Sequence, residues 1–92
     1  MIEQLNLRVM KVHPLPSGRI KAFVDVVVNE AILIKGVRIV SSLKGGVFVS
    51  MPQEMGKNSR WYERVRCLKP EVRQHVNEVV LDAYQASQQF AV

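Results

Sequence analysis

The sequence predicts an α+β fold, in which an antiparallel meander sheet of four to five strands is followed by one C-terminal amphipathic helix packed on it. Two patterns predict this class. Side chains alternate along residues 20–29 with the period of two that is typical of a strand. From residue 70 the apolar residues recur at spacings of three and four, which is typical of a helix. No internal repeat or long linker interrupts the 92 residues, so we expect a single domain, 1–92.

Strand limits follow from the alternating runs and from the turn-forming residues between them. The predicted strands span residues 5–12, 20–29, 31–40 and 47–52, and the interval 61–67 is compatible with a short fifth strand. Two prolines, a serine and a glycine predict a hairpin loop after the first strand, and Asn29-Glu30 predicts a two-residue turn after the second. Gly36 interrupts the third run and predicts a bulge or a close backbone approach, because glycine inside a strand commonly marks one or the other.

The helix is predicted for residues 70–88. Pro70 suits the first helical turn, and Glu71 places negative charge near the positive end of the helix dipole. The apolar face carries Val72, Val76, Val79, Val80, Ala83 and Tyr84. Valine lowers helix propensity by roughly a few tenths of a kcal/mol, whereas burying it contributes about 1.5 kcal/mol or more. Packing on the sheet therefore favours the helix.

Composition limits the classes of function. Apolar residues make up 48% of the chain and aromatic residues 7%, which predicts one aliphatic core without a deep catalytic cavity. We therefore expect that the protein is not an enzyme. So small a domain has a thin margin of stability, which self-association would increase. Lysine and arginine number 13 against 8 acidic residues, a net charge of +5, which indicates either simple solubility or a polyanionic partner such as nucleic acid.

Cys67 is the single cysteine, which excludes an intramolecular disulfide and a zinc site with paired cysteines. His13 and His75 lack metal-ligand spacing with each other or with Cys67, so no metal or cofactor is expected. We expect His13 to be an exposed loop residue and His75 to lie at the boundary of the helix's apolar face. Cys67 is expected to be a small buried apolar side chain and not a nucleophile.

The chain carries no recognisable targeting or membrane segment. Its first residues lack the apolar core of a secretory signal. No stretch reaches the roughly 20 apolar residues that a membrane-spanning helix needs. Together with the lone cysteine, these features predict a soluble protein of the reducing cytoplasm with no membrane partner.

Cations and rings gather between the predicted sheet and helix. The candidate nucleic-acid-binding residues are Lys57, Arg60, Tyr62, Arg64, Arg66, Lys69 and Arg73. If the segment from residue 61 is extended, Tyr62, Arg64 and Arg66 share one side and Trp61 packs inward. Arginine there would meet phosphate oxygens in bidentate geometry. The alternative is a solvated loop beside an ordinary core tryptophan.

The order of strands, the single helix and two segments are similar to a known family. The segments are Val37-Arg38-Ile39-Val40 and Gly46-Val47-Phe48-Val49-Ser50-Met51-Pro52. The chain resembles the SpoVG family, named for a bacterial stage V sporulation and septation protein, over residues 5–84. The resemblance implies a small dimeric protein that binds DNA, and RNA as well, to regulate gene expression and, in some bacteria, cell division.

The chain departs from the family after Met51-Pro52. There the family commonly has basic residues and a turn similar to Thr-Pro-Asp-Gly, whereas this chain has Gln53-Glu54-Met55 and then Gly56-Lys57-Asn58-Ser59. Arg38 corresponds to a basic position that is typical of the family, and an aromatic residue commonly stands at the place of Trp61. The leading hypothesis is a homodimeric DNA- and RNA-binding regulator with sequence-tolerant or moderately specific binding. The alternative is a protein-interaction module in septation that binds no nucleic acid.

Overall fold

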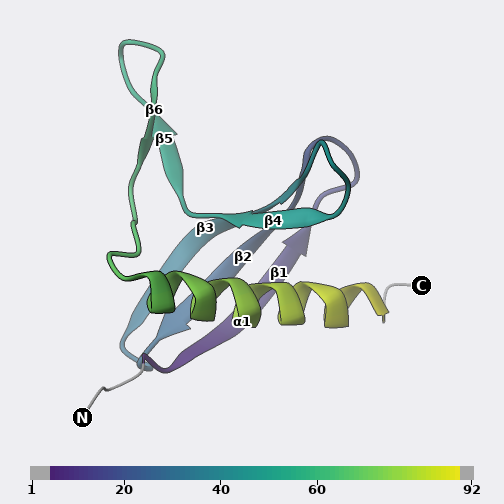
Figure 1. Ribbon diagram of the computed structural model, residues 1–92, viewed down its shortest axis with the longest axis vertical. Coiled ribbons are helices and arrows are strands. Elements are labelled where there is room, and N and C mark those ends of the chain that lie inside the picture. Colours follow the sequence, from purple (N-terminus) through teal and green to yellow (C-terminus); the bar gives the residue numbers. More distant parts are fainter. Residues whose placement is uncertain (1–4, 90–92) are drawn as a thin grey trace.

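The computed structural model describes residues 5–89 and has the α+β fold that the sequence predicts (Figure 1). A four-stranded sheet, a separate two-stranded sheet and one helix make up the fold. The elements in chain order are β1 (Leu7–Pro14), β2 (Ile20–Val28), β3 (Ile32–Ser41), β4 (Val47–Ser50), β5 (Gln53–Met55), β6 (Trp61–Glu63) and α1 (Pro70–Gln89).

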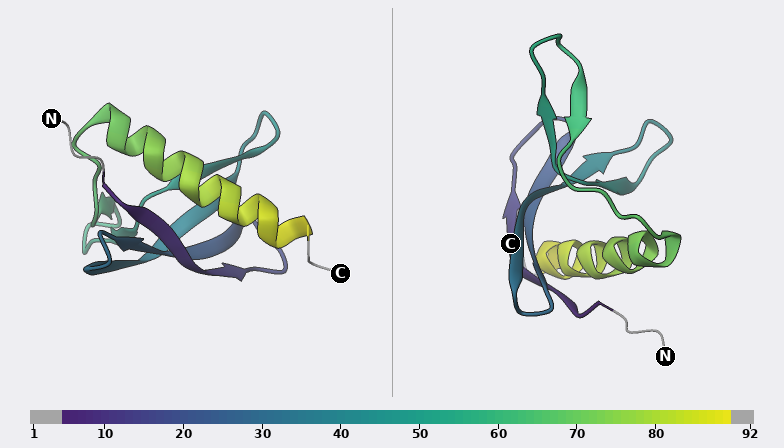
Figure 2. Two further views of the ribbon diagram at one scale, coloured as in Figure 1. Left: turned by 90° about the horizontal axis from the view of Figure 1, so that it is seen from below. Right: turned by 90° about the vertical axis from the view of Figure 1, so that its left-hand side faces the viewer.

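The larger sheet is the predicted antiparallel meander. Its strands lie in the order β1-β2-β3-β4, so each pairs with its neighbour in sequence. The helix covers one face of this sheet and packs mainly on β1, β4 and β2 (Figure 2). The predicted limits of the first four strands and of the helix differ from the observed ones by at most two residues.

The core lies between α1 and the sheet face that it covers. Its largest fully buried side chains are Ile39, Val24, Val37 and Val80. Val76, on the same helix face, is also buried, which confirms that the valines of the helix pack on the sheet. Within residues 5–89, no helix is long and apolar enough to cross a membrane.

Two irregularities in strand pairing meet at Asp25. On one side, the register of β1 against β2 shifts between Val9 and Lys11. On the other, the pairing of β2 with β3 shifts opposite Gly36, whose φ is +88°. The predicted bulge at Gly36 is confirmed, and Asp25 lies between the two shifts with only 7% of its surface exposed.

His13 is placed differently from the sequence expectation. It lies in β1 instead of the following loop, it is half-buried, and its Nε2 lies 3.0 Å from Oδ2 of Asp25. The expectation of an exposed loop residue was wrong because the shift after Val9 changes which side chains of β1 face which side. His75 is half-buried at the edge of the core, as predicted, and its ring donates from Nε2 to the carbonyl oxygen of Leu5 at 3.1 Å.

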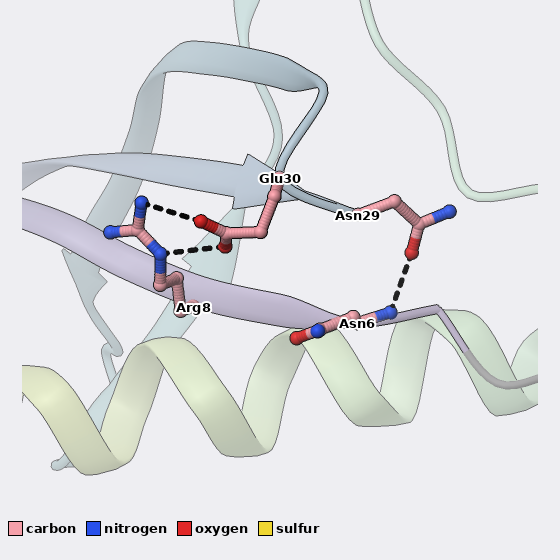
Figure 3. A network of polar contacts seen from close by, with 4 residues as sticks. All are labelled: Asn6, Arg8, Asn29 and Glu30. Carbon is pink, nitrogen blue, oxygen red and sulfur yellow. Dashed lines mark hydrogen bonds and ion pairs between the residues drawn. The ribbon is translucent and has the colours of Figure 1, made fainter.

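The turn between β2 and β3 includes the predicted Asn29-Glu30 pair, and both residues have positive φ. Two side chains of this turn form hydrogen bonds with Asn6, just before β1, and with Arg8 in β1 (Figure 3). Oδ1 of Asn29 accepts the backbone N–H of Asn6 at 2.8 Å. The guanidinium of Arg8 donates to both carboxylate oxygens of Glu30, at 2.7 and 2.9 Å. These hydrogen bonds connect the first strand to the turn at this end of the sheet.

Candidate nucleic acid interface

A hairpin projects from the end of β4, away from the sheet and helix (Figures 1 and 2). It is formed by β5 and β6, which pair in the register Gln53↔Glu63, Glu54↔Tyr62 and Met55↔Trp61. The sequence predicted neither β5 nor this pairing. The fifth strand, predicted for 61–67, covers only residues 61–63 and pairs outside the main sheet.

Local hydrogen bonds hold the tip of the hairpin in shape. The N–H of Gly56 donates to the carbonyl oxygen of Arg60 at 2.8 Å, and Nδ2 of Asn58 donates to Oη of Tyr62 at 2.8 Å. A Cβ at position 56 would lie 2.6 Å from the ring of Tyr62, so the ring lies directly over this glycine. Lys57 and Arg60 are thereby displayed on a hydrogen-bonded, exposed turn.

Arg64 and Arg66 are held by acidic neighbours. Nε of Arg64 forms an ion pair with Glu54, across the hairpin. Nη2 of Arg66 lies 3.3 Å from a carboxylate oxygen of Glu63. Both arginines stay largely exposed, so these pairs are weak and open to competition by an external anion.

Lys69 and Arg73 lie at the start of α1 and differ in their surroundings. Lys69 is exposed, and its carbonyl oxygen accepts the N–H groups of Val72 and Arg73, each at 3.1 Å. Arg73 is half-buried, and its Nη2 donates to the carbonyl oxygen of Val49 at 2.9 Å. The side chain of Arg73 therefore holds the helix against β4.

The seven predicted residues thus occupy three places, namely the hairpin, the connection 64–69 and the first turns of α1. Within residues 5–89, Lys57, Arg60 and Lys69 form no ion pair with an acidic side chain. Tyr62 and Arg64 line one shallow pocket together with Lys57. Arg66 does not line that pocket, because the strand ends at Glu63.

Trp61 does not pack inward, contrary to the expectation from sequence. It is 56% exposed, and its indole ring lies 5.5 Å from Cζ of Arg38. The same guanidinium lies 5.9 Å from the ring of Phe23, and Nη2 of Arg38 donates to the carbonyl oxygen of Gln53 at 3.3 Å. Arg38 thus joins the sheet to the base of the hairpin through its cation–π interaction with Trp61 and its hydrogen bond to Gln53, while Phe23 of the sheet holds the same guanidinium.

Sequence reasoning overlooked a surface next to the hairpin. Phe48, in β4, is 45% exposed and lines an open depression together with Arg19, Arg38 and Trp61. The signal was present in the alternation of β4, because Val47 and Val49 face the core and the ring between them must face outward.

The described residues do not form a metal-binding cluster. Within residues 5–89, no group of three or more His, Cys, Asp or Glu side chains is arranged to hold one. Cys67 is half-buried and packs against the core, where it behaves as a small apolar side chain.

Comparison with known proteins decides the family. The family model described as SpoVG matches residues 2–86. The chain belongs to the SpoVG family. The first SpoVG segment quoted from the sequence lies in β3 and the second spans β4 and the residues beside it, and they place Arg38 and Phe48 on the outer sheet face, next to the hairpin. The departure from the SpoVG pattern, at Gln53-Glu54-Met55, forms β5.

SpoVG relatives match most of the chain. A protein of Fusobacterium nucleatum, provisionally named septation protein SpoVG, is 30% identical over 84 residues, which cover 91% of this chain and 89% of that protein. A protein of Desulforudis audaxviator with the same name is 29% identical over 84 residues, covering 91% and 92%. One of Symbiobacterium thermophilum is 34% identical over 70 residues, covering 76% of this chain and 49% of that longer protein.

Proposed function

We propose that this SpoVG protein is a homodimeric DNA- and RNA-binding regulator that acts in gene regulation and cell septation. The observation that carries the proposal is the projecting hairpin, which displays Lys57 and Arg60 without acidic partners in the described chain. The net charge of +5 adds a long-range attraction for polyanions. The relatives' name, septation protein, supports the link to cell division.

Binding is proposed to be dominated by phosphate contacts. The guanidinium of Arg60 can hold two phosphate oxygens at once, whereas Lys57 and Lys69 act as point charges. Arg64 and Arg66 can exchange their exposed carboxylate partners for phosphate. Such contacts position a nucleic acid but carry little sequence information, which fits sequence-tolerant or moderately specific binding.

The homodimer is proposed on the basis of the sheet edges. β1 and β4 are the outer strands of the four-stranded sheet, so each has one side without a strand partner in the described chain. An unpaired edge of a small sheet is a template for pairing with a second copy. A dimer would present two hairpins and a doubled net charge to one nucleic acid.

The protein is further proposed to act in the cytoplasm and without catalysis. Its regulatory effect would come from occupying a nucleic acid. A protein partner in septation could then be recruited by, or compete with, the bound nucleic acid.

Fluorescence anisotropy with labelled duplex DNA and single-stranded RNA, at a low and a high salt concentration, tests the proposal. Saturable binding that weakens steeply with salt is the expected result, because counterion release drives phosphate binding. Absence of binding to both probes at low salt would contradict it. Salt-insensitive capture of a septation protein in that case would favour the alternative of a protein-interaction module.

A further inference from the structure

An open depression of about 380 Å³ lies where the outer faces of β3 and β4 meet the base of the hairpin. Figure 1 shows this corner, in which β4 and the hairpin run in different directions. The residues around it that matter here are Arg19, Arg38, Phe48, Ser50, Gln53 and Trp61. Its size is at the lower end of the range for small-ligand sites, which begins at about 300 Å³.

Two aromatic rings border this depression and remain accessible. Phe48 comes from the sheet and Trp61 from the hairpin, and roughly half of each residue's surface is exposed. Trp61 is nevertheless positioned, because the guanidinium of Arg38 lies against its ring and is itself held by Phe23 and the Gln53 carbonyl. The rings are therefore presented on fixed elements and not on a loose loop.

The electrostatic character of the depression favours an anionic occupant. Arg19 and Arg38 both line it, and no acidic side chain of the described residues does. Ser50 and Gln53 add neutral polar groups between the rings and the arginines. Rings for stacking, arginines for phosphate and short polar groups for base edges are the combination that binds single-stranded nucleic acids.

We propose that this depression holds unpaired bases of a single-stranded nucleic acid, stacked on Phe48 and Trp61. The adjacent phosphates would be bound by Arg19 and by Lys57 and Arg60 of the hairpin. This inference rests on the proposed nucleic-acid binding and deepens it by naming the strand form and the base contacts. A duplex cannot use the rings in the same way, because its bases are already stacked on each other. Duplex DNA would be held by the phosphate contacts alone.

Trp61 is the only tryptophan of the chain, so its fluorescence reports this site directly. The experiment titrates the full chain with oligouridylate, with an abasic oligonucleotide of equal length and with duplex DNA, while anisotropy of labelled copies measures binding. The variants are Phe48→Ala and Trp61→Phe. Leu68→Ala is the matched control, because Leu68 is equally apolar, is 89% exposed and does not line the depression.

Oligouridylate is expected to quench the fluorescence of Trp61 saturably. The abasic strand and the duplex are expected to leave it unquenched. Phe48→Ala should weaken oligouridylate binding about tenfold, as expected for the removal of one stacking ring. Trp61→Phe, which keeps a ring, should retain most of the affinity, and Leu68→Ala should match the wild type. Duplex binding should be equal in all four proteins.

Three results would overturn the inference. If oligouridylate binds by anisotropy but leaves Trp61 unquenched and Phe48→Ala has no effect, base stacking at this site is wrong while the proposed function stands. If neither oligouridylate nor duplex binds at low salt, the proposed function fails and the inference fails with it. Quenching of Trp61 by an apolar peptide but not by oligouridylate would also count against it, and would indicate a protein partner.

Discussion

Arg73, near the start of α1, donates a hydrogen bond from Nη2 to the carbonyl oxygen of Val49 in β4, at 2.9 Å. Val49 is buried in the core, and β4 is an outer strand of the sheet. The hydrogen bond therefore fastens the helix to the strand that leads into the hairpin. It also occupies a basic side chain that the sequence suggested as a phosphate ligand.

Arg73→Ala is expected to lower the free energy of unfolding by about 1.5 kcal/mol or more, because a hydrogen bond from a charged donor is removed and a half-buried carbonyl is left unpaired. Urea unfolding followed by circular dichroism measures the change. Lys69→Ala, an exposed cation one turn earlier, should leave the stability nearly unchanged. Equal stability of the two variants would show that Arg73 has no structural role.

Glu54→Gln and Glu63→Gln are expected to strengthen duplex binding by about two- to fivefold each, because they release Arg64 and Arg66 from exposed ion pairs and remove negative charge. Anisotropy titrations at low salt measure the affinities. Glu78→Gln changes the net charge equally on an exposed part of α1 and serves as the control. An equal gain in all three variants would mean that net charge, and not the freed arginines, is responsible.

His13→Ala is expected to destabilise the fold by about 1–3 kcal/mol, because the carboxylate of the buried Asp25 loses the one side-chain partner that the described structure gives it. Lys11→Ala removes an exposed cation that is the cross-strand neighbour of Asp25 but makes no hydrogen bond to it, and is the control. Chemical denaturation at neutral pH compares the two. A destabilisation no greater for His13→Ala than for Lys11→Ala would mean that water replaces the histidine at no cost.

The Arg8–Glu30 pair predicts a dependence of stability on acid pH (Figure 3). The hydrogen bond from Arg8, and to a lesser extent its charge, lowers the pKa of Glu30 below its ordinary value. A carboxylate with a lowered pKa in the folded state stabilises the protein at pH above its unfolded pKa. That contribution is lost as the pH falls through the folded pKa.

Glu30→Gln should therefore be slightly less stable than the wild type at neutral pH and equally stable in strong acid. Urea midpoints of both proteins, measured from neutral to acid pH, give the difference. High salt should reduce the difference at neutral pH, because both side chains of the pair are exposed to solvent. A gap between the proteins that stays constant down to strong acid would contradict this account.

The sheet and helix could be predicted because their signals are local and repeated. Alternation over nine residues of β2 and the apolar stripe of α1 each contain several independent indications of the same structure. Gly36 could be interpreted as a bulge because few other roles suit a glycine inside a strand. The local sequence patterns of these elements therefore favour the same structure as the packing of the whole fold.

The hairpin could not be predicted because the interactions that form it join separate segments of the chain. Gln53-Glu54-Met55 has neither alternation nor strand propensity, and it becomes a strand by pairing with residues 61–63. Trp61 was expected to pack inward because an extended segment places it opposite Tyr62, Arg64 and Arg66, but Arg38, distant in sequence, provides its partner at the surface. His13 was misplaced because a single register shift in β1 cannot be seen in the residue pattern.

Phosphate binding by the hairpin is best measured through the salt dependence of duplex binding. The measurement compares the slope of log affinity against log salt concentration for the wild type and for a Lys57→Ala/Arg60→Ala double variant. Lys44→Ala, in the turn between β3 and β4, is the control. We expect a slope shallower by about 1.8 in the double variant, or about 0.9 for each phosphate that is no longer neutralised, and an unchanged slope in the control. A wild-type slope retained in the double variant would contradict phosphate binding by the hairpin.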